Sequence, residues 1–119
     1  MENSQLFLET AVKAADLKRA EDIVALDVQE VSLLADYFVI CHGNNARQME
    51  AIANEVIEQL EKAGAHLQRV EGMKSERWIL IDFSDIVIHI FSEDERAFYD
   101  LEKLWHDAPM VDLSCWVED

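Results

Sequence analysis

The sequence predicts one α/β domain of the α+β type, in which a mixed β-sheet is flanked by helices. Helical apolar spacing alternates with short β-branched runs in the order α-β-β-α-β-β-β-α. A long helical segment separates two strands, which indicates one crossover connection, and the last two strands are close enough to form a hairpin. The chain has 119 residues, half of them hydrophobic, which suffices for one core and one domain.

The N-terminal part of the chain predicts one helix and two strands. Ser4 is a suitable N-cap for a helix that runs to about Arg19 with an apolar stripe. Residues 23–28 are rich in β-branched side chains and predict the first strand. Residues 36–41 predict a second strand, whose nearly continuous apolar sequence is typical of a strand buried on both faces. This strand ends at residues 42–43.

The middle of the chain predicts a long helix followed by a modest strand. Asn44 or Asn45 caps the helix, and Gly64 ends it. Its apolar residues recur at helical spacing: Met49, Ile52, Ala53, Val56, Ile57 and Leu60. Residues 66–71 predict the next strand, which a turn at Gly72 follows.

Residues 77–82 and 85–91 predict two strong strands, joined by a loop of residues 83–84. This loop would place six side chains on one face of the sheet in three facing pairs, Asp82 with Asp85, Leu80 with Val87 and Trp78 with His89. The other face carries isoleucines that we expect in the core: Ile79, Ile81, Ile86 and Ile88. The loop lacks the glycine or asparagine that two-residue turns favour, which leaves the register open.

A last helix and a short tail complete the chain. Ser92 and Glu95 form a capping box that opens the helix, and Pro109 ends it. The helix carries an apolar, partly aromatic stripe: Phe98, Leu101, Leu104 and Trp105. We therefore expect a single domain over residues 1–109, followed by a loose acidic tail over residues 110–119.

Charge and targeting signals narrow the classes of function. The chain has 25 acidic and 10 basic side chains, and its formal net charge is −15. Affinity for nucleic acids relies on cationic groups, so this chain is repelled by phosphate over most of its surface. The charge suits a basic protein partner, or serves only solubility. The sequence has neither the roughly 20 apolar residues that span a bilayer nor a signal peptide, so we expect no membrane association and a cytoplasmic location.

The cysteines and histidines indicate neither a metal site nor a cofactor. Cys41 ends an apolar run and Cys115 lies in the tail, a pattern that fits a reducing compartment rather than a disulfide framework. Neither cysteine has an adjacent positively charged group or an obvious catalytic base, so a nucleophilic thiol is not supported. No ligand spacing connects the cysteines with the four histidines: His42, His66, His89 and His106.

The predicted face of the last hairpin is the candidate site. Trp78, Leu80, Val87 and His89 mix large apolar with polar groups, and Trp is enriched among the residues that dominate protein interfaces. The sequence therefore favours a partner-binding surface here. The alternative is that a helix covers this face, with His89 as a hydrogen-bonded histidine of the core.

Two further interpretations of the polar residues remain open. Asp36, Asp82 and Asp85 would act as metal-binding carboxylates in a minimal nucleotidyltransferase, although acids beside a turn also serve local hydrogen bonding. Residues 43–45 lie between a strand and a helix, where backbone N–H groups hold anions, but a phosphate-binding loop needs several spaced glycines. A plain turn is the simpler interpretation. Beside the partner-binding surface and the nucleotidyltransferase, the sequence leaves open a third class of function, a generic acidic adaptor that binds a different basic protein.

Several segments, taken in order, resemble the ribosomal silencing factors, the RsfS, Iojap or YbeB family. The resemblance covers roughly residues 4–107. It is carried by these segments: Asp36-Tyr37-Phe38-Val39-Ile40-Cys41 with Gly43, Arg47-Gln48, Glu71-Gly72, Trp78-Ile79-Leu80-Ile81-Asp82, Val87-Ile88-His89-Ile90-Phe91 and Tyr99-Asp100-Leu101-Glu102-Lys103-Leu104-Trp105. Asn45 stands where many members have serine, which weakens a phosphate-holding role, and Ser84 where many have glycine, which weakens the predicted register.

The resemblance implies a nucleotidyltransferase-like fold without catalytic acids, and a translational repressor rather than an enzyme. Such proteins bind the fourteenth protein of the large ribosomal subunit and sterically block the small subunit when nutrients are scarce; a role in large-subunit biogenesis is also implied. We then expect three apolar anchors, Trp78, Leu80 and Val87, with His89 hydrogen-bonding beside them. Asp82 would meet a Lys or Arg, and contact with rRNA would be small. The resemblance also implies a possible homodimer.

Overall fold

The computed structural model describes residues 2–33, 35–74, 77–99, 103 and 106–117. Within these residues the elements follow the predicted order α-β-β-α-β-β-β-α. The helices are α1 (Glu2–Leu17), α2 (Ala46–Lys62) and α3 (Glu93–Tyr99). The strands are β1 (Glu21–Asp27), β2 (Tyr37–Gly43), β3 (Arg69–Glu71), β4 (Trp78–Asp82) and β5 (Ile86–Ser92).

The five strands form one mixed sheet in the order β1-β2-β5-β4-β3, as the sequence predicts for the fold class. The pair β2 and β5 is parallel, whereas the other neighbours are antiparallel. The crossover that starts at β2 therefore includes α2, β3 and β4 before the chain returns as β5. The strand that directly follows α2 lies at the far edge of the sheet and does not contact β2.

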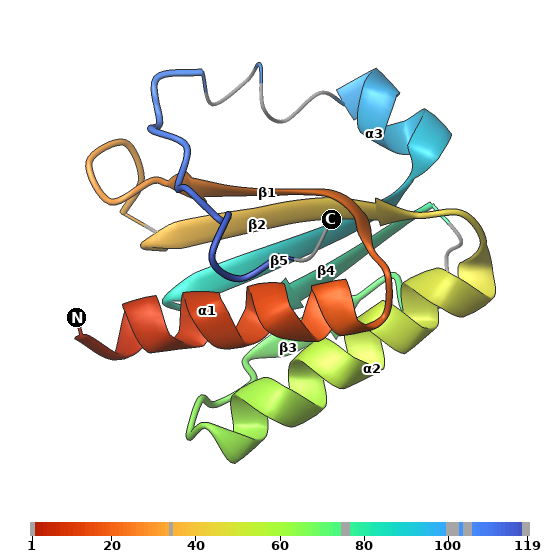
Figure 1. The fold of residues 1–119 in the computed structure, drawn as a ribbon. Helices are drawn as coiled ribbons and strands as arrows, with labels where there is room; N and C mark the ends of the chain where they lie inside the picture. Colours follow the sequence, from red (N-terminus) through yellow and green to blue (C-terminus); the bar gives the residue numbers. More distant parts are fainter. Residues whose placement is uncertain (1, 34, 75–76, 100–102, 104–105, 118–119) are drawn as a thin grey trace.

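Helices α1 and α2 cover one face of the sheet, and α3 lies on the other side, where β2 and β5 end (Figure 1). The main core lies between the sheet and the first two helices. The expectation for the hairpin isoleucines is confirmed, since at most 1% of each side chain is exposed: Ile79, Ile81, Ile86 and Ile88. The predicted apolar stripe of α2 faces the same core, with Met49, Ile52, Ala53, Val56 and Leu60 buried.

The ends of α2 are formed as the sequence predicts. Of the two candidates, Asn45 is the N-cap, and its side-chain oxygen accepts a 2.8 Å hydrogen bond from the backbone N–H of Gln48. Gly64 follows the C-cap with a φ of +101°, a left-handed conformation that glycine adopts without steric cost.

The register of the last hairpin differs from the predicted one by two residues. Asp82 lies opposite Val87, Leu80 opposite His89 and Trp78 opposite Phe91. A two-residue shift leaves every side chain on its predicted face, because the strand period is two. The predicted facing pairs are therefore wrong, whereas the predicted faces are right.

The turn explains the shift. The hairpin closes with a 3.0 Å hydrogen bond from the backbone N–H of Phe83 to the carbonyl of Ile86, so the loop consists of residues 84–85 rather than 83–84. Ser84 adopts a φ of +76°, and the side chain of Asp82 accepts its backbone N–H at 2.7 Å. Such a side-chain turn stabilises a left-handed residue that is not glycine.

The segment after Pro109 is packed, which corrects the expectation of a loose tail. The carbonyl of Pro109 accepts the N–H of Asp27 at 2.8 Å, and the N–H of Val111 donates to the carbonyl of Ala25 at 2.9 Å. Four apolar residues then pack against the main core: Val111, Leu113, Trp116 and Val117. The segment thus covers part of the exposed edge of β1 (Figure 1).

Half of the predicted capping box is present at the start of α3. The hydroxyl of Ser92 accepts the backbone N–H of Glu95 at 3.3 Å, whereas the backbone N–H of Ser92 donates to the carbonyl of Arg77 at 2.8 Å. The predicted helix continues further, but residues 100–102 and 104–105 lie outside the described residues. Leu101, Leu104 and Trp105 of the predicted stripe are among them.

Candidate functional site

The sheet face opposite α1 and α2 carries all five predicted site residues. Strand pairing aligns the side chains of this face into rows across the sheet. One row consists of Met110, Leu26, Phe38, Val87, Asp82 and Arg69, the second of Val24, Ile40, His89, Leu80 and Glu71, and the third of Glu21, His42, Phe91 and Trp78. The structure thus brings together residues from every strand, including β3, which sequence reasoning did not assign to the site.

Burial differs strongly along these rows. Over β1 and β2 the face forms a second, smaller core: Leu26, Val28, Ala35, Phe38, Ile40, Phe91 and Ala108. Towards β4 the side chains of Trp78, Leu80, Asp82 and Val87 are only half-buried. His89 lies between the two regions and is 6% exposed. His89 is therefore buried, as the alternative expects, whereas Trp78 remains partly exposed.

A groove of about 410 Å³ opens on the half-buried side of this face. Its lining combines an apolar part with a polar rim: Phe38, Leu80, Val87 and His89, together with Gln68, Arg69, Asp82 and Ser84. We call this the β-face groove. Concave, mostly apolar surfaces with a few polar groups are typical of binding sites.

Trp78 and His89 form a hydrogen-bonded aromatic pair beside the groove. The indole Nε1 donates to Nδ1 of His89 at 3.2 Å, and the Trp78 ring stacks on Phe91 with centroids 5.0 Å apart. Burial lowers the pKa of His89 from 6.5 to about 4, so the imidazole is neutral at pH 7. Because an indole N–H can only donate, Nδ1 is the acceptor and the ring proton resides on Nε2.

The Nε2 atom of His89 is buried and has no hydrogen-bond partner among the described residues. The edge-to-face contact with Phe38, at 5.3 Å between centroids, encloses the ring from another side. A buried donor without an acceptor costs about 1–3 kcal/mol. His89 therefore lines the groove while its unpaired Nε2–H lowers the free energy of unfolding.

Three charged residues form the rim at β3 and β4. Arg69 lies directly opposite Asp82 in the pairing of the two strands. Its guanidinium contacts Glu71 at 2.8 Å through Nη1 and Asp82 at 3.6 Å through Nε. One cation is thus shared by two carboxylates at the edge of the groove.

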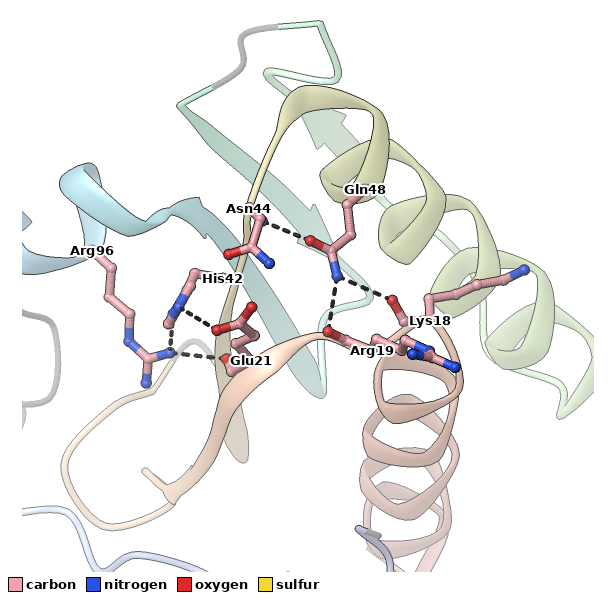
Figure 2. Close-up of polar contacts among 7 residues, drawn as sticks. All are labelled: Lys18, Arg19, Glu21, His42, Asn44, Gln48 and Arg96. Carbon is pink, nitrogen blue, oxygen red and sulfur yellow. Dashed lines mark hydrogen bonds and ion pairs between the residues drawn. The ribbon is translucent and has the colours of Figure 1, made fainter. Parts of the chain in front are cut away.

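A second polar cluster lies at the opposite end of β2 (Figure 2). Arg96 of α3 is 3.0 Å from Nδ1 of the buried His42 through Nη1, and the same nitrogen donates to the carbonyl of Glu21 at 3.3 Å. Nε2 of His42 lies 3.7 Å from the Glu21 carboxylate. Because arginine only donates, Nδ1 accepts and Nε2 carries the proton that faces Glu21. This cluster fastens α3 to β1 and β2, and no sequence signal indicated it.

The turn at residues 43–45 is a plain strand-to-helix connection rather than an anion-binding loop. The backbone N–H of Asn44 donates to the Gln48 side chain at 2.6 Å, and the amide of Gln48 donates to the carbonyl of Arg19 at 2.9 Å (Figure 2). These bonds and the Asn45 cap use polar groups that an anion would need. The space beside Gly43 is tight, since a methyl group there would lie 3.0 Å from Cγ of Met49 and 3.3 Å from its backbone nitrogen.

Of the three carboxylates considered for catalysis, that of Asp82 is engaged in local structure, whereas Asp36 and Asp85 are joined through their backbones. Asp82 holds the hairpin turn, and the backbone N–H of Asp36 donates to the carbonyl of Asp85 at 2.8 Å. Within the described part of the chain, no group of three or more His, Cys, Asp or Glu side chains is placed to hold a metal ion. Burial raises the pKa of the Cys41 thiol to about 12, which keeps it protonated.

In the described ranges, no helix combines the length and apolar character that crossing a bilayer requires.

The sequence and the fold match proteins of one family. A family model described as "Ribosomal silencing factor during starvation" (RsfS) matches residues 1–118. A Bacillus subtilis protein named ribosomal silencing factor RsfS is 50% identical over 111 residues, which cover 93% of this chain and 94% of that protein. A mouse protein named mitochondrial assembly of ribosomal large subunit protein 1 is 30% identical over 91 residues, or 74% of this chain and 40% of that protein.

A solved structure supports the same relationship. The crystal structure of a Bacillus halodurans protein aligns with a TM-score of 0.81 and 48% sequence identity. The alignment covers 92% of this chain and 99% of that one.

Proposed function

The chain belongs to the family of ribosomal silencing factors, and we propose that it represses translation without catalysing a reaction. In this proposal it acts in the cytoplasm, binds the large ribosomal subunit and sterically prevents the small subunit from joining. The family name supports the silencing role, and the name of the mouse relative connects that protein with large-subunit assembly.

The observation that carries the proposal is the β-face groove. Half-buried apolar side chains, Leu80 and Val87, lie beside the partly exposed Trp78. We propose that these three residues, with His89 and Asp82, contact the fourteenth protein of the large subunit. Apolar contacts in such a groove supply most of the binding free energy, since interface energy concentrates in a few buried anchors.

Charge supports a basic protein partner over RNA. The net charge of −15 repels the rRNA phosphates and attracts cationic protein surfaces. Long-range attraction speeds the encounter and selects the partner more than it adds affinity. The acid-rich surface thus directs the molecule towards a basic ribosomal protein, whereas the groove holds it there.

The test is a sedimentation profile of purified ribosomal subunits with the added protein. We expect the wild-type chain to co-sediment with large subunits and to shift joined ribosomes towards free subunits. Leu80→Asp places a charge in the groove and should weaken binding at least tenfold, which corresponds to about 1.4 kcal/mol or more. Leu17→Asp is the matched control, because Leu17 is 67% exposed on α1, away from the groove.

Two results would reject this proposal. A wild-type chain that leaves joined ribosomes unchanged would reject the silencing mechanism. A folded Leu80→Asp variant that binds as well as Leu17→Asp would reject the groove as the contact surface.

The nucleotidyltransferase alternative is tested by measuring the thermal stability of the protein with nucleotide and Mg²⁺. A ligand at 100 times its dissociation constant adds about 2.7 kcal/mol to the free energy of unfolding.

A further inference from the structure

The charged rim of the β-face groove has two ion pairs of unequal quality. Arg69 contacts Glu71 at 2.8 Å, within the range of a charge-assisted hydrogen bond, but lies 3.6 Å from Asp82. The guanidinium is therefore hydrogen-bonded to Glu71 and only adjacent to Asp82. One carboxylate oxygen of Asp82 therefore lies near Arg69 without accepting a hydrogen bond from it.

Asp82 is held in place independently of Arg69. Its Oδ1 accepts the backbone N–H of Ser84 at 2.7 Å, whereas Oδ2 is the atom that faces Arg69. The Asp82 side chain is 26% exposed, compared with 59% for both Arg69 and Glu71. A fixed, half-buried carboxylate at the wall of a groove is a prepared site for a cation, because a side chain that is already oriented loses little conformational freedom on binding.

We propose that Arg69 is a displaceable internal counter-ion of Asp82, which a lysine or arginine of the bound protein replaces. This inference rests on the proposed function, since it names the group that the groove accepts from a basic partner. When the incoming cation takes Asp82, Arg69 remains paired with Glu71, so no charge is left without a partner. Glu71 thus lowers the free-energy cost of displacing Arg69 from Asp82. The attraction between Arg69 and Asp82 in turn lowers the affinity for the incoming cation.

The test compares equilibrium binding of full-length variants to purified large ribosomal subunits at fixed salt. Arg69→Gln should bind about two- to fivefold more tightly, which converts to about 0.4–1 kcal/mol, the range of an exposed ion pair. In a chain that already carries Asp82→Asn, the same Arg69→Gln change should have little effect, because the carboxylate for which the two cations compete is gone.

Glu71→Gln should act in the opposite direction. Without Glu71, Arg69 has only Asp82 as a partner, and displacement leaves its charge unpaired. We expect binding to weaken about two- to fivefold. Matched controls come from the pair Glu58–Lys62 on α2, whose atoms are 3.1 Å apart. Lys62→Gln and Glu58→Gln make the same charge changes away from the groove.

The outcomes separate this role from the proposed function. If wild-type protein does not bind large subunits, the proposed function fails and this role fails with it. If wild-type protein binds but Arg69→Gln behaves as Lys62→Gln does, net charge alone matters and the internal counter-ion is rejected. Weaker binding by Arg69→Gln would also overturn it, since Arg69 would then itself contact an anionic group of the partner.

Discussion

Trp78 donates a 3.2 Å hydrogen bond to Nδ1 of His89, and this contact fixes the tautomer of a buried imidazole at the edge of the β-face groove. The two side chains come from neighbouring strands but are not directly opposite, because Trp78 faces Phe91 in the pairing. The bond therefore runs diagonally across the sheet face. It connects the stability of the site to pH and to the identity of residue 78.

His89 should make folding stability fall on acidification. Its folded-state pKa is about 4, below the ordinary value of 6.5, so protonation favours the unfolded chain. Stability from this group is fully present above pH 6.5 and is lost as the pH falls towards 4, by about 3 kcal/mol in total. In urea unfolding across this range, His89→Phe should lose less stability than the wild type. His106→Gln, which replaces an exposed histidine that does not line the groove, is the control substitution. Parallel curves for wild type and His89→Phe would contradict the expectation.

Trp78→Phe should destabilise the fold by about 1 kcal/mol beyond the loss of apolar area, since Nδ1 of His89 loses its donor. The same substitution in a His89→Phe background should cost less, because the hydrogen bond is already absent. A double-mutant cycle measured by urea unfolding gives this difference. A coupling energy near zero would show that the bond contributes nothing to stability.

The cap of α2 gives a matched pair of substitutions. Asn45→Ala removes the acceptor of the Gln48 N–H and should cost about 0.5–2 kcal/mol in the free energy of unfolding. Asn44→Ala should cost less, because Asn44 engages Gln48 through its backbone N–H, which alanine retains. Equal losses for the two variants would mean that the side-chain cap is not what stabilises this helix start.

Removal of residues 110–119 should destabilise the domain. The truncation deletes the hydrogen bond from Val111 to Ala25 and the packing of Trp116 against the main core. Full burial of one large side chain contributes about 1.5–3 kcal/mol, and the truncation removes four partly buried apolar side chains, so we expect a loss of about 2 kcal/mol in urea unfolding. Unchanged stability would mean that residues 1–109 are a complete folding unit and that the segment only rests on the surface.

The sequence by itself determined the elements and the direction that each strand face points. Alternation is a local property with a period of two, so Ile79 and Ile81 had to face the core together, and Trp78 and Leu80 had to face the other way. The caps at Asn45 and Gly64 were readable for the same reason, because each cap depends on residues within a few positions of it.

Only the tertiary structure decided which distant segments meet. Two hairpin registers that differ by two residues bury the same isoleucines, so the apolar pattern does not distinguish them, and the left-handed Ser84 held by Asp82 makes the choice. The parallel pairing of β2 with β5, the position of Arg69 opposite Asp82, and the packing of the segment after Pro109 against β1 depend on contacts far apart in the chain. No local periodicity encodes such contacts, because they are selected by the joint packing of the whole domain.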